Sequence, residues 1–248
     1  RLFIAHQETI DAGPQHRRVA AHEPELFAWL ADQHLAIDTQ FRQDLAPAFG
    51  NRLLDQLSRQ HQHLLDELKL NVRVVGIANS KQATLADEEI DLDAYTSELA
   101  ASDTTNIAAF TDAIIDRNMR NSIFVDVTAS DRVVEQYRKL LAKSVSVIAC
   151  NKIAASSEFS NYEGLKNTAR EYAANFFFET NVGAGLPVIN TLNDLLRSGD
   201  KVRRIDAVLS GTLNFVFNNY DGSRPFAEVV RQAQDGGYTE PDPRLDLS

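Results

Sequence analysis

Residues 122–150, SIFVDVTASDRVVEQYRKLLAKSVSVIAC, contain two short β-branched runs with a helix-length segment between them. The patterns of Ser122–Val127 and Val145–Cys150 are typical of strands. Between them, Asp131–Lys143 carries five apolar side chains at helical spacing. A strand, a crossover helix and a second strand predict two neighbouring parallel strands, and therefore an α/β fold.

The same alternation continues on both sides of this unit. We expect helices over 51–69, 91–100, 104–118, 160–174, 186–197, 211–219 and 225–235, and strands at 72–78, 176–179 and 201–209. The rhythm changes after Asn151, which predicts a domain boundary near residue 150 with an α+β domain beyond it. Residues 1–49 show one helix, at 22–34, and little strand signal, and they form an unassigned N-terminal segment.

Composition excludes several classes of protein. The 248 residues include 25 basic and 35 acidic side chains, a net charge of −10, which disfavours general binding to nucleic acid or to an anionic membrane. No run approaches the roughly 18 apolar residues of a membrane span. The single cysteine, Cys150, allows no intrachain disulfide, so we expect a cytoplasmic setting. Residue 1 is arginine and the only methionine is Met119, so we expect a fragment.

Open parallel sheets bind ligands beyond the carboxyl ends of their strands. Asn79, Ser80 and Lys81 follow the first clear strand. In a dinucleotide-binding fold an acid there favours NAD, whereas a base accommodates the NADP phosphate, so this tip leans to NADP. An ordinary polar turn that contains a lysine is an equal alternative.

Lys152 follows the strand that ends at Cys150. A lysine at such a position can polarise a carbonyl or orient a carboxylate. A solvated lysine with no such role is the commoner case for an unselected residue.

Two later loops are also candidates. Gly183 and Gly185 mark a tight turn before a helix, where the backbone can approach an ion closely. In the stretch 236–243, GGYTEPDP, two prolines stiffen a turn that carries acids, which suits capture of an ammonium group. For both loops, an ordinary turn without a ligand is the alternative.

From about Gly50 to Ser248 the chain resembles homoserine dehydrogenase, most closely the version fused to aspartate kinase. The resemblance lies in six stretches that keep the family's order: Val74–Ser80, Val125–Ser130, Asn151–Ala154, Glu179–Pro187, Leu209–Asn214 and Gly237–Arg244. It implies a Rossmann-like NAD(P)-binding domain over 50–150 and a partial α+β substrate and dimerisation domain over 151–248. The implied reaction is NAD(P)H-dependent interconversion of aspartate 4-semialdehyde and homoserine, in a protein that forms homo-oligomers.

The resemblance also implies roles for individual residues. Those implied for the cofactor are Gly50, Asn79, Ser80, Lys81, Thr128, Ala129 and Ser130. Those implied for catalysis are Lys152, Glu240 and Asp246, which also bind substrate together with Thr212, Gly237, Tyr238 and Thr239. Backbone carbonyls of Glu179, Val182, Ala184 and Leu186 are implied to hold a monovalent cation, usually sodium.

The chain departs from the family pattern in two places. The glycine-rich pyrophosphate turn should end at Gly50, but its first two glycines fall on Leu45 and Pro47. Proline has no N–H to offer a phosphate. The family pattern also continues beyond Ser248 to an aspartate and a lysine on one helix, the lysine being the favoured proton donor.

These departures leave a second hypothesis: a non-catalytic fragment, or an oligomerisation or regulatory module of the same fold. An ordinary helix start over Leu45–Gly50, without a phosphate cradle, would favour it. A frameshift upstream of Gly50 is a third explanation for the loss of similarity there.

Overall fold

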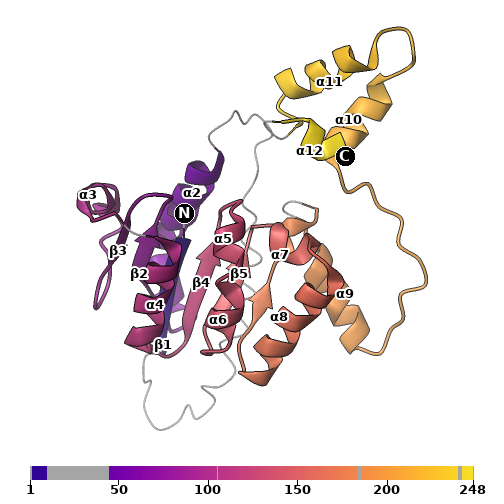
Figure 1. The fold of residues 1–248 in the computed structure, drawn as a ribbon. Helices are drawn as coiled ribbons and strands as arrows, with labels where there is room; N and C mark the ends of the chain where they lie inside the picture. Colours follow the sequence, from indigo (N-terminus) through magenta and orange to yellow (C-terminus); the bar gives the residue numbers. More distant parts are fainter. Residues whose placement is uncertain (1, 10–44, 105, 184–185, 240–241, 248) are drawn as a thin grey trace.

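The structure is a computed structural model that describes residues 2–9, 45–104, 106–183, 186–239 and 242–247. Its centre is a six-stranded sheet in the order β3-β2-β1-β4-β5-β6, with helices on both faces (Figure 1). The strands are β1 (Leu2–Thr9), β2 (Leu70–Ala78), β3 (Ala83–Leu85), β4 (Ser122–Asp126), β5 (Ser146–Ala149) and β6 (Phe176–Phe177). The helix predicted over 22–34 lies outside the described residues.

The helices agree with most of the predicted ranges. They are α2 (Leu45–Asp66), α3 (Tyr95–Ala101), α4 (Ile107–Arg117), α5 (Asp131–Val134), α6 (Tyr137–Leu141), α7 (Ile153–Ser156), α8 (Phe159–Glu171), α9 (Val188–Arg197), α10 (Gly211–Asn219), α11 (Phe226–Asp235) and α12 (Arg244–Leu247), with a 3₁₀ turn, η2, over Glu179–Asn181. The single helix predicted over 131–143 is two short helices, α5 and α6.

The four strands predicted before residue 180 all run in one direction. β4 pairs with β5 and β5 with β6 in parallel. β2 and β4 are both antiparallel to β1, so they run the same way as each other. The sheet also continues past the expected domain boundary near residue 150, because β6 pairs with β5.

The central strand β1 corrects the expectation of little strand structure near the N-terminus. It pairs with β2 along its whole length and with β4 from Leu2 to His6, antiparallel in both cases. Its second half, His6-Gln-Glu-Thr9, has a polar sequence that no strand pattern marks. Two buried strands with unpaired backbone groups favour any extended segment between them, so tertiary context outweighs local propensity here.

Side-chain alternation along β4 divides the core into two layers. Ile123 and Val125 face a cluster that includes Leu54 and Leu64 of α2, whereas Phe124 faces the cluster around Tyr137 on the opposite side. This is the two-residue period of a strand buried on both faces. The strands β4, β5 and β6 that lead to the carboxyl edge of the sheet are therefore packed into the core.

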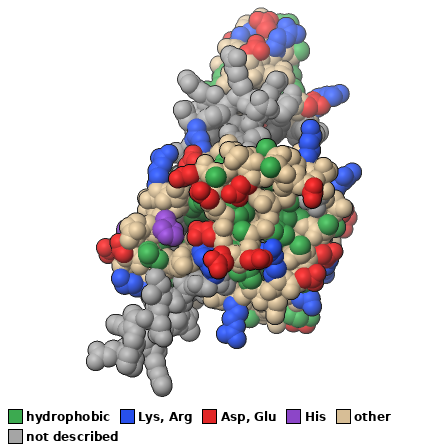
Figure 2. Space-filling view, turned by 90° about the vertical axis from the view of Figure 1, so that its left-hand side faces the viewer, with side chains coloured by type: hydrophobic (Ala, Val, Ile, Leu, Met, Phe, Trp, Pro, Cys, Tyr) green, Lys and Arg blue, Asp and Glu red, His purple; other side chains and the backbone are tan. Residues whose placement is uncertain are grey.

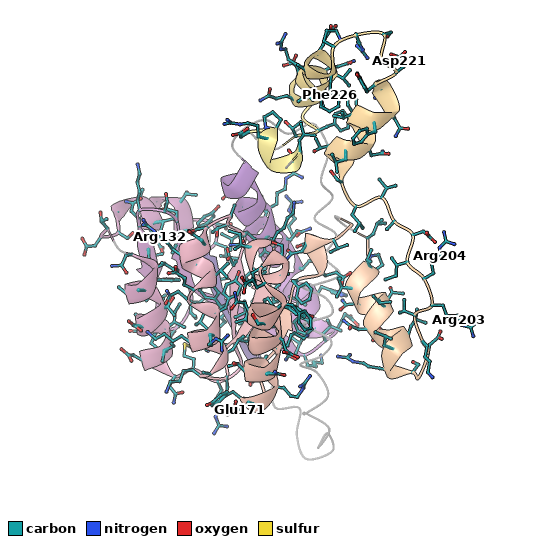
Figure 3. The ribbon with its side chains drawn as sticks, turned by 45° about the vertical axis from the view of Figure 1, so that its right-hand side comes forward. Arg132, Glu171, Arg203, Arg204, Asp221 and Phe226 are labelled. Carbon is teal, nitrogen blue, oxygen red and sulfur yellow. The ribbon has the colours of Figure 1, made fainter. Side chains whose placement is uncertain are left out.

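The strand predicted over 201–209 is wrong. The structure shows an irregular, exposed segment in which Ile205 is 67% and Val208 76% exposed. Figure 3 shows Arg203 and Arg204 pointing outward from it. An extended segment becomes a strand only when a neighbour accepts its backbone hydrogen bonds, and no described strand pairs with this one.

Beyond this segment, α10, α11 and α12 form a small helical unit that stands apart from the sheet (Figure 1). It has its own core, in which Val216, Val229 and Ala233 are fully buried.

Candidate functional site

The candidate site begins where β4, β5 and β6 end. Thr128, Ala129 and Ser130 follow β4, Lys152 follows β5, and the turn from Glu179 follows β6. Because parallel neighbours end at the same edge, the structure brings these three segments together as the sequence predicts.

A fully buried carboxylate, Asp126, lies at the centre of this edge. Its Oδ1 accepts a hydrogen bond from the backbone N–H of Thr128 at 2.7 Å. Its Oδ2 accepts from the Tyr137 hydroxyl at 2.5 Å and from Asn151 Nδ2 at 3.1 Å. Burial, and then the negative charge of Asp126, raise the pKa of Tyr137 well above its ordinary value, so this hydroxyl stays a donor.

Asn151 connects the three segments. Its amide donates to the backbone carbonyl of Ser130 at 3.0 Å, in addition to Asp126. Its side-chain oxygen accepts from the Ile153 N–H at 3.1 Å, and its backbone carbonyl accepts from Asn181 Nδ2 at 3.2 Å. The exposed Lys152, which lies at the N-cap of α7, therefore follows a buried residue whose side chain is held by three hydrogen bonds.

The loop over residues 128–130, which is implied for the cofactor, is held by an internal hydrogen bond as well. Thr128 Oγ1 accepts from the Ser130 N–H at 3.2 Å, while Ala129 is exposed between them. The short loop thus presents its surface from a fixed backbone.

The turn after β2 closes a β-hairpin with β3. Asn79 Oδ1 accepts from the N–H groups of Lys81 and Gln82, each at 2.8 Å, so this side chain shapes the turn. Ser80 and Lys81 are exposed at its tip. Of the three residues implied for the cofactor at this tip, Ser80 and Lys81 face solvent and Asn79 holds the backbone of the turn.

The phosphate turn expected before Gly50 is a helix. Leu45–Gly50 forms the first turns of α2, and Gly50 is buried within that helix. In dinucleotide-binding folds the phosphate turn joins the carboxyl end of the central strand to a helix. Here Leu2 pairs with Ala78 and Asp126, so the antiparallel β1 has its carboxyl end at the opposite edge. The described residues therefore form no glycine-rich diphosphate cradle.

In the turn after β6, the buried side chain of Glu179 has a role that the sequence did not predict, because only the backbone carbonyl of this residue was expected to bind a ligand. The Glu179 carboxylate accepts from the N–H groups of Ile189, at 2.8 Å, and Asn190, at 2.7 Å. A negative charge there stabilises the N-terminal end of α9.

Two of the four carbonyls predicted to hold a cation also accept backbone hydrogen bonds. The Glu179 carbonyl accepts from Val182 at 3.4 Å, and the Leu186 carbonyl accepts from Val188 at 2.9 Å. Each carbonyl keeps a second lone pair that can face a cation. Ala184 lies outside the described residues.

The remaining predicted residues gather in the helical unit. The buried Thr212 hydroxyl donates to the backbone carbonyl of Tyr238, whose ring stacks on Phe215 with centroids 4.4 Å apart. Gly237 has a φ of 76°, which glycine adopts without strain. Thr239 follows, and Asp246 lies on α12, which contacts α10. Glu240 is outside the described residues.

The predicted site residues therefore form two groups. One lies at the carboxyl edge of the sheet and the other in the helical unit, and the irregular segment 198–210 joins them (Figure 1). On the face in Figure 2, acidic and basic side chains are interspersed. Among the described residues, no helix is both long enough and apolar enough to cross a membrane.

Comparison with known proteins assigns the family. The model described as "Homoserine dehydrogenase, NAD binding domain" matches residues 48–179, and that described as "Homoserine dehydrogenase" matches 187–248. The chain belongs to the homoserine dehydrogenase family. The match begins within α2, so β1 and the segment after it lie outside the family pattern.

Two relatives are plant proteins named bifunctional aspartokinase/homoserine dehydrogenase 2, chloroplastic. The protein of Zea mays is 40% identical and that of Arabidopsis thaliana 42% identical, each over 201 residues. The match covers 80% of this chain but 22% of each relative, so the chain spans about a fifth of their length.

A solved structure with a similar fold is a hyperthermophilic archaeal homoserine dehydrogenase in complex with NADPH. Its TM-score is 0.64 at 25% identity, over 79% of this chain and 60% of that one. A Candida auris protein of unknown function has a TM-score of 0.62 at 32% identity, over 71% of this chain and 51% of that one.

Sequence reasoning missed the residues that hold the site. Asp126 and Asn151 lie within the stretches that match the family, but the sequence assigns no role to their side chains or to the Glu179 carboxylate. Asp126 did carry a signal: an acid within the run Ile-Phe-Val-Asp-Val is either a strand end or a buried polar group that needs donors. Its three donors come from Thr128, Tyr137 and Asn151, and local sequence does not show that these meet.

Proposed function

We propose that the protein acts as a homoserine dehydrogenase and interconverts aspartate 4-semialdehyde and homoserine with NAD(P)H. The observation that carries this proposal is the edge where the loop 128–130 and Lys152 are fixed side by side by Asp126 and Asn151. Membership of the family and the NADPH complex of the archaeal relative support it.

In this proposal the two groups of residues divide the work. A bound nicotinamide supplies or accepts the hydride. Thr128, Ala129 and Ser130 contact its nicotinamide end, and the Lys152 ammonium polarises the substrate carbonyl or orients its carboxylate.

The helical unit binds the amino-acid end of the substrate. Thr212 and the turn Gly237–Thr239 frame it, and the Glu240 carboxylate holds its ammonium group, with Asp246 close by. For one small molecule to touch both groups, this unit must lie against the carboxyl edge when substrate is bound.

Four finer assignments belong to the same proposal. NADP is preferred to NAD because the hairpin tip 79–81 offers a lysine and no acid. Sodium, or another monovalent cation, binds at the carbonyls of Glu179, Val182, Ala184 and Leu186. The protein assembles as a homo-oligomer and works in the cytoplasm.

A second candidate, a non-catalytic module of the same fold, is favoured by one specific observation. α2 begins at Leu45 as a continuous helix and β1 is antiparallel, so the described residues form no diphosphate cradle. A dinucleotide would then have to bind without the backbone N–H groups that normally hold its phosphates.

Titration with NADPH, followed by nicotinamide fluorescence, separates the two candidates. Saturable binding with a Kd in the micromolar range supports the enzyme, and homoserine oxidation is then assayed with Lys152→Ala as the inactive comparison. Lys81→Ala should weaken binding of NADPH and leave that of NADH unchanged. An absence of binding at millimolar NADPH contradicts the enzyme proposal for this chain and supports the module.

A further inference from the structure

The buried carboxylate Asp126 is the group at the carboxyl edge that no proposed catalytic or binding step uses. Its side chain is completely buried, so it cannot itself meet a dinucleotide or a substrate. A buried charge is costly unless it is fully hydrogen-bonded, and Asp126 has three donors. What Asp126 contributes to this edge is therefore the set of bonds that it accepts.

We propose that Asp126 is a positioning residue that sets the loop 128–130 and Lys152 relative to each other, acting through Asn151. This inference rests on the proposed function, because it assigns the residue that orders the cofactor end of that site. Asp126 touches neither reactant in this scheme, so it is not itself a catalytic residue.

The two oxygens of Asp126 face different segments. Oδ1 holds the N–H of Thr128, which fixes the start of the loop after β4. Oδ2 holds Asn151, which follows β5 and precedes Lys152. One carboxylate therefore joins the loop after β4 to the loop after β5.

Asn151 transmits this constraint further. With its amide oriented by Asp126, its side-chain oxygen faces the Ile153 N–H in the first turn of α7. The same amide bonds to the carbonyl of Ser130 at the far end of the loop. Both ends of the loop 128–130 are thus bonded to one two-residue unit, Asp126 with Asn151.

This arrangement requires that both terminal atoms of the side chain at position 126 accept hydrogen bonds. A carboxylate accepts at each oxygen, whereas an amide must present its NH₂ on one side. In Asp126→Asn the Tyr137 hydroxyl can rotate to accept that NH₂. The Asn151 amide cannot reverse its direction without abandoning Ile153 and Ser130. The substitution, nearly isosteric, therefore separates Asp126 from Asn151 without opening a cavity.

The experiment compares amide hydrogen exchange, residue by residue, in the full chain and in Asp126→Asn. The reporter amides are those of Thr128, Ser130 and Ile153. Ile153 makes no bond to Asp126, so its response measures transmission through Asn151. We expect exchange at Ser130 and Ile153 to accelerate about tenfold or more, the range for a buried group that loses its partner.

Ser146→Ala is the matched control. Ser146 is also a buried polar residue of the sheet, and its hydroxyl accepts the Asn175 N–H at 3.0 Å at the opposite end of β5. This variant should expose Asn175 to exchange and leave Ser130 and Ile153 unchanged. If Asp126→Asn and Ser146→Ala give the same rates at Ile153, Asp126 is a structural residue only and the proposal is overturned.

A second variant keeps the test decisive if Asp126→Asn does not fold. Asn151→Ala leaves the bond from Thr128 to Asp126 in place and removes the link to Ser130 and Ile153. It should leave Thr128 protected by its own bond to Asp126 and accelerate exchange at Ser130, whose N–H bonds to Thr128 and not to Asn151. Unchanged exchange at Ser130 would show that Asn151 does not hold the far end of the loop, and would overturn the proposal.

NADPH affinity separates this inference from the proposed function. If the unaltered chain binds NADPH, Asp126→Asn should weaken the Kd about tenfold and Ser146→Ala should not change it. Equal affinity in all three proteins refutes the positioning role and leaves the proposed function intact. If the unaltered chain does not bind NADPH, the proposed function fails, and the exchange measurements still decide whether Asp126 orders this edge.

Discussion

The Glu179 carboxylate gives the sharpest prediction about stability. Its two oxygens hold the N–H groups of Ile189 and Asn190, which have no intrahelical partner at the start of α9. In Glu179→Gln one oxygen keeps its bond, and the new NH₂ faces the other N–H. The variant loses one charge-assisted hydrogen bond, about 1.5–3 kcal/mol, and the charge–dipole interaction, about 0.3–1 kcal/mol. The expected loss is about 2–4 kcal/mol, a large part of the ~5–15 kcal/mol of a typical domain.

Urea unfolding followed by far-UV circular dichroism measures this loss as a difference in the free energy of unfolding. Glu171→Gln is the matched control, because Glu171 is exposed at the last residue of α8 (Figure 3). It should change stability by no more than about 0.5 kcal/mol. If the two variants agree to within that margin, the Glu179 carboxylate does not stabilise α9 and the reasoning is refuted.

Two further predictions concern the sheet and its buried tyrosine. In Gly76→Ala the new Cβ would lie 2.7 Å from Leu85 Cδ2 and 3.2 Å from Phe110 Cζ, so thermal unfolding should show a loss of about 1–3 kcal/mol. Gly211→Ala, where nothing lies within 4 Å, should show none, and equal melting curves would contradict the close packing. Because burial and Asp126 raise the pKa of Tyr137, the folded protein keeps a proton that the unfolded chain releases above a pH of about 10. The free energy of unfolding should therefore fall as pH rises from about 10, and tyrosinate absorbance should show that Tyr137 ionises only when the protein unfolds. Tyr137→Phe, the control, should lack this absorbance change. Ionisation of Tyr137 in the folded protein would contradict the prediction.

Strong local patterns predicted most of the sheet. β2, β4 and β5 are short runs rich in Val and Ile, and burial on both faces selects for such runs. The helix around Leu54 and Leu64 was predicted from its apolar stripe, and it begins earlier than expected because Pro47 is tolerated in a first turn.

The elements that were not predicted depend on partners distant in the sequence. β1 is a strand because β2 and β4 leave a place for it, and 201–209 is not a strand because no described neighbour pairs with it. The two segments show the same effect in opposite directions: a segment with a polar second half becomes a strand, and one with a strand-like pattern stays irregular.

The sequence located the strand ends that carry the candidate site residues, but not the hydrogen bonds that hold those residues. The ends of strands β4 and β5 could be located from the sequence, and with them Thr128 and Lys152. The bonds that hold these residues involve Tyr137 and Asn151, which meet Asp126 only after α6 and β5 have packed. Spacing along the chain carries no information about that contact.

The antiparallel central strand has a consequence for how the molecule folds. Without β1 the sheet is two separate pieces, the hairpin β2–β3 and the parallel unit β4–β5–β6, each built from contacts between consecutive segments. β1 joins them, and its pairing with β4 closes a loop of more than one hundred residues. A ribosome synthesises β1 before both of its partners, and the second partner, β4, is made much later than β2. The pairing of β1 with β4 should therefore be the last and slowest step in forming the sheet, since folding slows as contacts become less local.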